Sequence, residues 1–102
     1  MTSDYTLRTD PGPFRAVWRG EKTAEFRKDD RQFQVGDIVN LIEFDRALGR
    51  CLYPIRQLYI RITHYQGAGY GIPEGYAMLS FKVVWRRVHQ PRSCRKCGEE
   101  KP

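Results

Sequence analysis

The sequence lacks any apolar run near the about 20 residues that a membrane-spanning helix needs, so we expect no membrane partner. Only three cysteines and two histidines are present, which is too few for the disulfide framework of a small secreted domain. The first four residues contain neither a basic start nor an apolar segment. We therefore expect a cytoplasmic protein.

Positive charge, in contrast, is in excess. The 102 residues carry a formal net charge of +6, and the pI is about 9.5. Such a balance favours a polyanionic partner, of which nucleic acid is the commonest. We expect one folded domain over residues 1–89 and a basic polar tail over residues 90–102. Much of the excess lies near the end of the chain, in Arg86, Arg87, Arg92, Arg95, Lys96 and Lys101.

Short segments of alternating apolar and polar residues predict about five strands and one short helix. The strands are expected at residues 5–8, 22–27, 38–44, 57–65 and 76–88, and the helix at residues 14–19. Gly20 is placed to end the helix, and residues 45–51 and 66–75 are expected to be loops. The predicted fold is mostly β, a small and mostly antiparallel barrel with the helix packed against it.

The most informative stretch is residues 20–37, where a strand leads into a dense run of charges. Alternation along the strand places Thr23, Glu25 and Arg27 on one face. We expect the two ends of the charged run to be pinned by apolar side chains, namely Phe26, Phe33 and Val35. A solvated charged loop is the alternative.

Residues 22–37 follow the pattern Lys-Thr-x-Glu-x-Arg-x-x-Asp-Arg-x-Phe-x-Val-Gly-Asp. Together with residues 41–45 and 61–80, this pattern resembles the ASCH-like domains of the PUA-like superfamily, in a small branch found in bacteria and phages. The resemblance covers roughly residues 5–85 and implies a pseudobarrel with a cleft between its first helix and the barrel. It implies that Gly20, Lys22, Glu25 and Arg27 line that cleft, and that RNA or a modified nucleotide binds there.

The chemistry of these side chains fits such a ligand. Lys22 and Arg27 can hold a phosphate or a carbonyl oxygen, and Glu25 can accept a hydrogen bond from the exocyclic amine of a base. The alternative is a surface salt bridge among them, worth ~0–1 kcal/mol. The full predicted ligand-binding set, with aromatic residues for base stacking, is Trp18, Lys22, Glu25, Arg27, Arg31, Tyr70 and Tyr76. Core packing is the alternative for Trp18.

Two other functions stay open. Some relatives in the resembled family are amidohydrolases acting on acylated cytidine, and Lys22, Thr23 and Glu25 are the candidates for that chemistry. Glu25 stands where those enzymes carry a nucleophilic threonine, so we favour binding without catalysis. The third possibility is a phage interaction protein whose basic surface engages a host component.

We expect no cofactor in the domain. Asp29, Asp30 and Asp37 could hold magnesium, but we favour turn capping by Asp30 or Asp37 and a clamp by Arg31. The Cys94 and Cys97 pair has the spacing of half a zinc site. Cys51 and His89 could complete that site only if the fold brings them close. We expect a monomer, with a dimer through the tail as the alternative.

Overall fold

The computed structural model describes residues 2–89, which form one helix and six strands. In chain order these are β1 (Tyr5–Thr9), α1 (Pro11–Trp18), β2 (Ala24–Lys28), β3 (Ile38–Asp45), β4 (Arg50–Cys51), β5 (Ile55–Gln66) and β6 (Tyr76–His89). Proline suits the first turn of a helix, and Pro11 begins α1. Gly20 follows the C-cap Arg19 with φ of 79°, as predicted for the residue that ends a helix.

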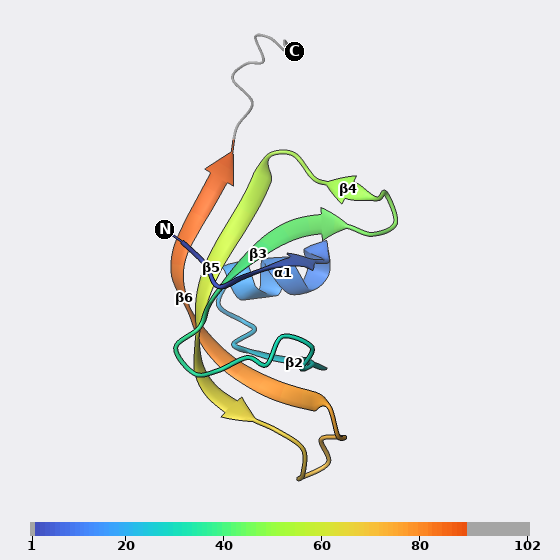
Figure 1. The fold of residues 1–102 in the computed structure, drawn as a ribbon. Helices are drawn as coiled ribbons and strands as arrows, with labels where there is room; N and C mark the ends of the chain where they lie inside the picture. Colours follow the sequence, from blue (N-terminus) through green and yellow to red (C-terminus); the bar gives the residue numbers. More distant parts are fainter. Residues whose placement is uncertain (1, 90–102) are drawn as a thin grey trace, which may run out of the picture.

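The strands form one curled sheet in the order β1-β3-β5-β6-β2, and β4 pairs with β3. β1 runs parallel to β3, whereas the other neighbouring strands pair antiparallel. Figure 1 shows the long strands β5 and β6 bending around α1, so that the sheet makes a half-barrel. The predicted fold class is confirmed as mostly β and barrel-like, with one short helix.

Two local features differ from the prediction, and a third is a parallel pair within the mostly antiparallel sheet. β2 begins at Ala24 because the main-chain N–H groups of Glu21 and Lys22 still bond to the Ala16 carbonyl and hold the chain against the helix end. The segment expected as a loop at residues 45–51 contains the short strand β4. β1 is parallel to β3 because α1 and β2 lie between them in the chain and supply the crossover that a parallel pair requires.

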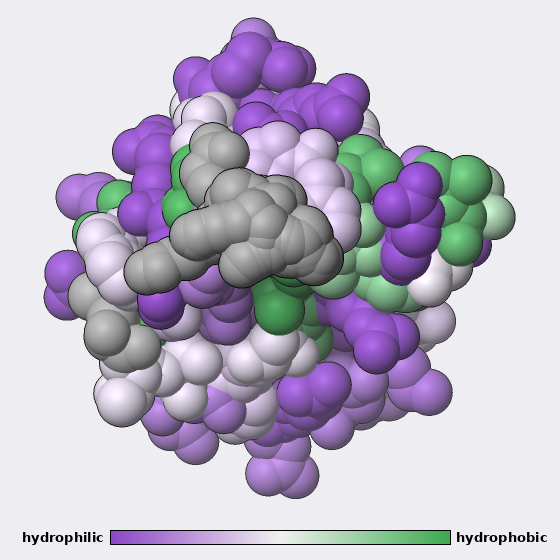
Figure 2. All heavy atoms as spheres, turned by 90° about the horizontal axis from the view of Figure 1, so that it is seen from above, coloured by the Kyte–Doolittle hydropathy of each residue, from purple (hydrophilic) through white to green (hydrophobic). Residues whose placement is uncertain are grey.

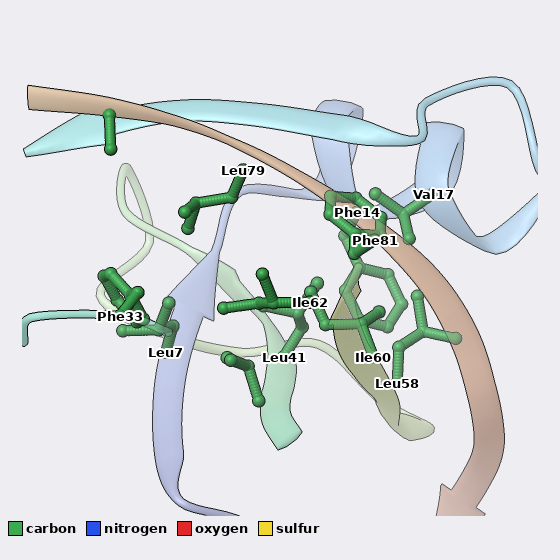
Figure 3. Close-up of a cluster of buried hydrophobic side chains, with 12 residues drawn as sticks. Leu7, Phe14, Val17, Phe33, Leu41, Leu58, Ile60, Ile62, Leu79 and Phe81 are labelled. Carbon is green, nitrogen blue, oxygen red and sulfur yellow. The ribbon is translucent and has the colours of Figure 1, made fainter. Parts of the chain in front are cut away.

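The core lies on the inside of the half-barrel. Register shifts in the pairing of β5 with β6, at Tyr59/Ile60 and Ile62/His64, are irregularities that bend the two strands. This curvature lets side chains from distant strands meet over α1, as Figure 3 shows. The core residues are Leu7, Phe14, Val17, Phe33, Val39, Leu41, Leu58, Ile60, Ile62, Ala77, Leu79 and Phe81.

One buried carboxylate fixes α1 to the sheet. Glu43 is 1% exposed, and its oxygens accept hydrogen bonds from Arg15 Nε at 3.1 Å and from Arg56 Nε and Nη2 at 2.9 and 3.0 Å. The Arg56 guanidinium also lies 5.5 Å from the ring centroid of Phe14 and 5.1 Å from that of Trp18. These contacts favour the packing role of Trp18 over a stacking role.

The outer surface carries mostly polar side chains. In the view of Figure 2, hydrophobic side chains gather only in small separate groups among hydrophilic ones. Across residues 2–89, no helix has the length and apolar character to cross a membrane.

Candidate functional site

A cavity of about 150 Å³ opens inside the half-barrel, and both edge strands, β1 and β2, contribute to its lining. Most of the lining is apolar, and in Figure 3 several of these side chains point toward one another across the space. They include Leu7, Phe33, Leu41, Ile62 and Leu79. The polar residues of the lining are Arg8, Thr9, Asp10, Glu25, Arg27 and Arg46. The cavity therefore offers an apolar interior with charged groups around it.

β2 supplies two of these charged groups through its alternation. Glu25 and Arg27 both line the cavity, while Phe26 between them is 48% exposed on the opposite face. Its ring stacks on Tyr76, with the two centroids 5.4 Å apart. The predicted common face is thus confirmed for Glu25 and Arg27, and that face points into the half-barrel. Thr23, predicted on the same face, precedes β2 and lines a neighbouring hollow instead.

Lys22 reaches Glu25 from a neighbouring hollow of about 330 Å³, which Gly20, Thr23 and Arg86 also line. Its Nζ lies 2.9 Å from Glu25 Oε1 and donates a 2.6 Å hydrogen bond to the Ala24 carbonyl. Lys22 and Glu25 thus form the salt bridge that the sequence analysis gave as the alternative. Glu25 lines the cavity, whereas Lys22 and Gly20, which the resemblance places in the same cleft, line the neighbouring hollow.

The charged loop between β2 and β3 is anchored by its first aspartate. Asp29 Oδ1 accepts a 3.0 Å hydrogen bond from the Phe33 N–H, and Oδ2 accepts one of 2.5 Å from the Tyr65 hydroxyl. The bond to Asp29 is the main reason that the pKa of Tyr65 is raised above its ordinary 10.0, with burial and the charge of Asp29 as lesser causes. Phe33 is 3% exposed, so it pins the loop as predicted.

Two arginines of this region rest on an aromatic pair. The rings of Tyr5 and Phe33 meet edge to face with centroids 5.1 Å apart. The Arg27 guanidinium carbon lies 5.6 Å from the Phe33 centroid, and that of Arg31 lies 5.9 Å from the Tyr5 centroid. These contacts orient both cations beside the cavity.

A comparison with protein families matches residues 5–81 to the family described as a domain of unknown function, DUF3850. The match covers well over half of the chain. The chain belongs to this family. The part matched to DUF3850 runs from β1 into β6 and includes every side chain that lines the cavity. No curated protein matches the chain.

Several predicted members of the site lie elsewhere in the DUF3850 domain. Tyr70 is 96% exposed in the loop between β5 and β6, and neither Tyr70 nor Tyr76 lines the cavity. Trp18 does not line it either. The expectation that Phe26 and Val35 pin the charged run is wrong, because they are 48% and 60% exposed. Phe26 lies on the uncovered outer face of an edge strand, where alternation alone does not bury it.

Asp30 and Asp37, two further aspartates of the charged loop, make contacts within the loop itself. Asp37 Oδ2 accepts a 2.8 Å hydrogen bond from the Gln34 N–H, the turn capping predicted for Asp30 or Asp37. Arg31 Nε lies 4.0 Å from Asp30 Oδ1, a weak version of the predicted clamp. Within residues 2–89, no group of three His, Cys, Asp or Glu side chains could hold a metal ion. Cys94 and Cys97 lie outside the described residues, so the zinc prediction stays a prediction.

Asp10 and Arg46 are site residues that the sequence analysis missed. Arg46 Nε pairs with Asp10 Oδ1 at 3.2 Å, and its Nη2 donates a 3.3 Å hydrogen bond to the Arg8 carbonyl. Arg46 follows β3 and Asp10 follows β1, and the parallel pairing of these strands brings the two residues together. No local pattern signals this contact, because it depends on the parallel register.

Proposed function

We propose that this DUF3850 domain binds a nucleotide or single-stranded RNA by taking one base into the cavity between β1 and β2. The observation that carries this proposal is the position of Glu25. Its carboxylate belongs to the lining of an otherwise largely apolar cavity, beside a cation, Arg27. A base has this same combination, a flat apolar ring with polar groups on its edge.

The size of the cavity favours one small ring. An apolar cavity of about 150 Å³ is large enough to take up a benzene-sized molecule. A six-membered pyrimidine base is close to that size, whereas a purine carries a second fused ring. The apolar lining from Leu7, Leu41 and Leu79 would contact the faces of the ring.

Glu25 then selects among the pyrimidines. A carboxylate accepts hydrogen bonds and donates none, so it pairs with the exocyclic amine of cytosine and not with the carbonyl of uracil. Lys22 occupies Oε1 of Glu25, and no hydrogen bond to Oε2 is found within residues 2–89. Oε2 is the oxygen that would accept a hydrogen bond from the amine of the base. Arg27 on the same face can donate to a carbonyl oxygen of the base.

The overall charge supports the same class of ligand. A net charge of +6 attracts polyanions. Binding of RNA would therefore weaken steeply as the salt concentration rises, because phosphate contacts release counterions. An interaction with an uncharged partner would lack this steep dependence.

A calorimetric titration of the full chain with the four ribonucleoside 5′-monophosphates at low salt tests the proposal. We expect the cytosine nucleotide to bind most tightly. Glu25→Gln should weaken its binding about 10-fold, since a hydrogen bond to a charged group contributes about 1.5 kcal/mol or more. Glu74→Gln is the matched control, because Glu74 is exposed in the loop between β5 and β6. No binding of any nucleotide at low salt, or equal losses in both variants, would refute the proposal.

A further inference from the structure

Next to the cavity lies a second hollow, of about 260 Å³, whose lining is dominated by arginines. It is lined by Thr6, Leu7, Arg8, Arg27, Arg31 and Arg46, and no acidic residue among residues 2–89 contributes to this lining. We infer that this arginine hollow binds a phosphate group of the ligand whose base enters the cavity. The inference rests on the proposed function and adds to it that the ligand is recognised as a phosphate ester.

The two spaces adjoin, since Leu7, Arg8, Arg27 and Arg46 line both of them. A ligand that places a ring in the cavity therefore has its neighbouring groups at the arginine hollow. Arg27 lines both the cavity and the hollow, whereas Arg31 lines the hollow and not the cavity. Arg31 is therefore the arginine whose contact with the phosphate would not be shared with the base.

Two of the guanidinium groups are held in place without strong acidic partners. Arg27 has no ion-pair partner within residues 2–89, and its bond from Nε to the Lys28 carbonyl is long, at 3.4 Å. Arg31 has only the 4.0 Å contact with Asp30. The aromatic pair of Tyr5 and Phe33 supports both side chains, so less rotamer entropy remains to be lost on binding.

Arg46 is more firmly bound, and its contacts leave donors free. Nε pairs with Asp10 and Nη2 bonds to the Arg8 carbonyl, which leaves the other N–H groups of the fork for a ligand. The Arg8 guanidinium lies over the Phe44 ring, 4.6 Å from its centroid. Four arginines against Asp10 and Asp30 leave a local formal charge of +2.

Arginine forks suit phosphate in particular. Each guanidinium presents several N–H groups in one plane, which match the oxygens of phosphate in paired hydrogen bonds. Four guanidinium groups around one hollow are more than an uncharged sugar needs. Both a terminal phosphate monoester and an internal phosphodiester of RNA have this chemistry.

The test compares three ligands by calorimetry on the full chain, namely cytidine, cytidine 5′-monophosphate, and a cytidine dinucleotide whose one phosphate is an internal diester. We expect the phosphorylated ligands to bind at least 10-fold more tightly than cytidine. The tighter-binding of these two ligands shows whether the hollow prefers a terminal phosphate monoester or an internal phosphodiester. Arg31→Gln and Arg46→Gln should each reduce that advantage several-fold.

Arg61→Gln is the matched control, because Arg61 is exposed on β5 and lines neither space. It removes the same charge and should keep the full advantage. Thermal unfolding confirms that each variant is folded, and Arg31→Gln removes a side chain that is 41% exposed, so it can be compared even if Arg46→Gln is unstable.

The outcomes separate the two proposals. If cytidine binds as tightly as its phosphate esters, or if Arg61→Gln costs as much as Arg31→Gln, the phosphate site is refuted while base binding stands. If the phosphate advantage follows Arg31 but Glu25→Gln changes nothing, the arginine hollow stands and the base reader fails. If none of the three ligands binds, both are refuted.

Discussion

Tyr5 and Arg31 hold each other through two contacts. The Tyr5 hydroxyl donates a 2.9 Å hydrogen bond to the Arg31 carbonyl, and the Arg31 guanidinium lies over the Tyr5 ring. The first residue of β1 thus fixes both the main chain and the side chain of a residue 26 positions later. This contact joins the loop after β2 to the opposite edge of the half-barrel.

Removing the Tyr5 hydroxyl should loosen that loop. We expect Tyr5→Phe to lower the free energy of unfolding by about 0.5–1 kcal/mol, the usual contribution of one hydrogen bond. The affinity for cytidine 5′-monophosphate should fall with it, because Arg31 loses its fixed position. Urea unfolding and calorimetry measure the two effects. Tyr70→Phe, at a residue that is 96% exposed, should change neither; equal effects of the two substitutions would contradict this role for Tyr5.

Glu43 is expected to be the largest single polar contribution to stability. Glu43→Gln leaves Arg15 and Arg56 without their shared carboxylate, and removal of one partner of a buried ion pair costs about 3–5 kcal/mol. We expect the lower end of that range, because Arg15 is 49% exposed. Glu21→Gln breaks an exposed pair with Arg19 and should leave the urea midpoint unchanged. A midpoint for Glu43→Gln equal to that of the wild type would refute this account.

A larger side chain in the cavity should change the affinity for the nucleotide more than the free energy of unfolding. Leu79 pairs with Glu25 in the sheet register and lines the cavity, so Leu79→Phe would place its larger ring in the space meant for the base. We expect binding of the cytosine nucleotide to fall at least 10-fold. The free energy of unfolding should change by less than the ~1–3 kcal/mol typical of overpacking a filled core. A destabilised variant that still binds would show that the ligand lies elsewhere.

The bond between Tyr65 and Asp29 makes stability depend on alkaline pH. Because the folded state raises the pKa of Tyr65 above 10.0, the bond contributes fully below that pH, and the contribution is lost as the pH rises through the folded pKa. We expect the urea midpoint of the wild type to fall above pH 10 more steeply than that of Tyr65→Phe. Parallel curves for the two proteins would show that Tyr65 is not responsible.

Hydrolysis is not expected. Thr23, the candidate nucleophile, lines the hollow beside Lys22 and not the cavity that Glu25 lines. Purified protein incubated with acylated cytidine should therefore release no acyl group, as measured by chromatography of the products. Turnover that disappears in Lys22→Ala would overturn this prediction and favour the amidohydrolase alternative.

Local patterns in the sequence predict the structural features that depend on residues close together in the chain. The alternation of β2 placed Glu25 and Arg27 on one face, and Gly20 marked the end of α1. Alternation does not show which face of β2 is covered, and the apolar side chain of Phe26 lies on the exposed one. Asp10 and Arg46 are far apart in the chain and meet only because β1 pairs parallel to β3. Tyr70 is a candidate for base stacking by residue type alone, and no residue of its loop lines the cavity.

A crystal structure of the chain with cytidine 5′-monophosphate tests the central claim most directly. We expect the ring in the cavity between β1 and β2, its amine within hydrogen-bond distance of Glu25, and the phosphate against Arg31 and Arg46. A nucleotide bound on the outer face, for example on the stacked rings of Phe26 and Tyr76, would contradict the claim.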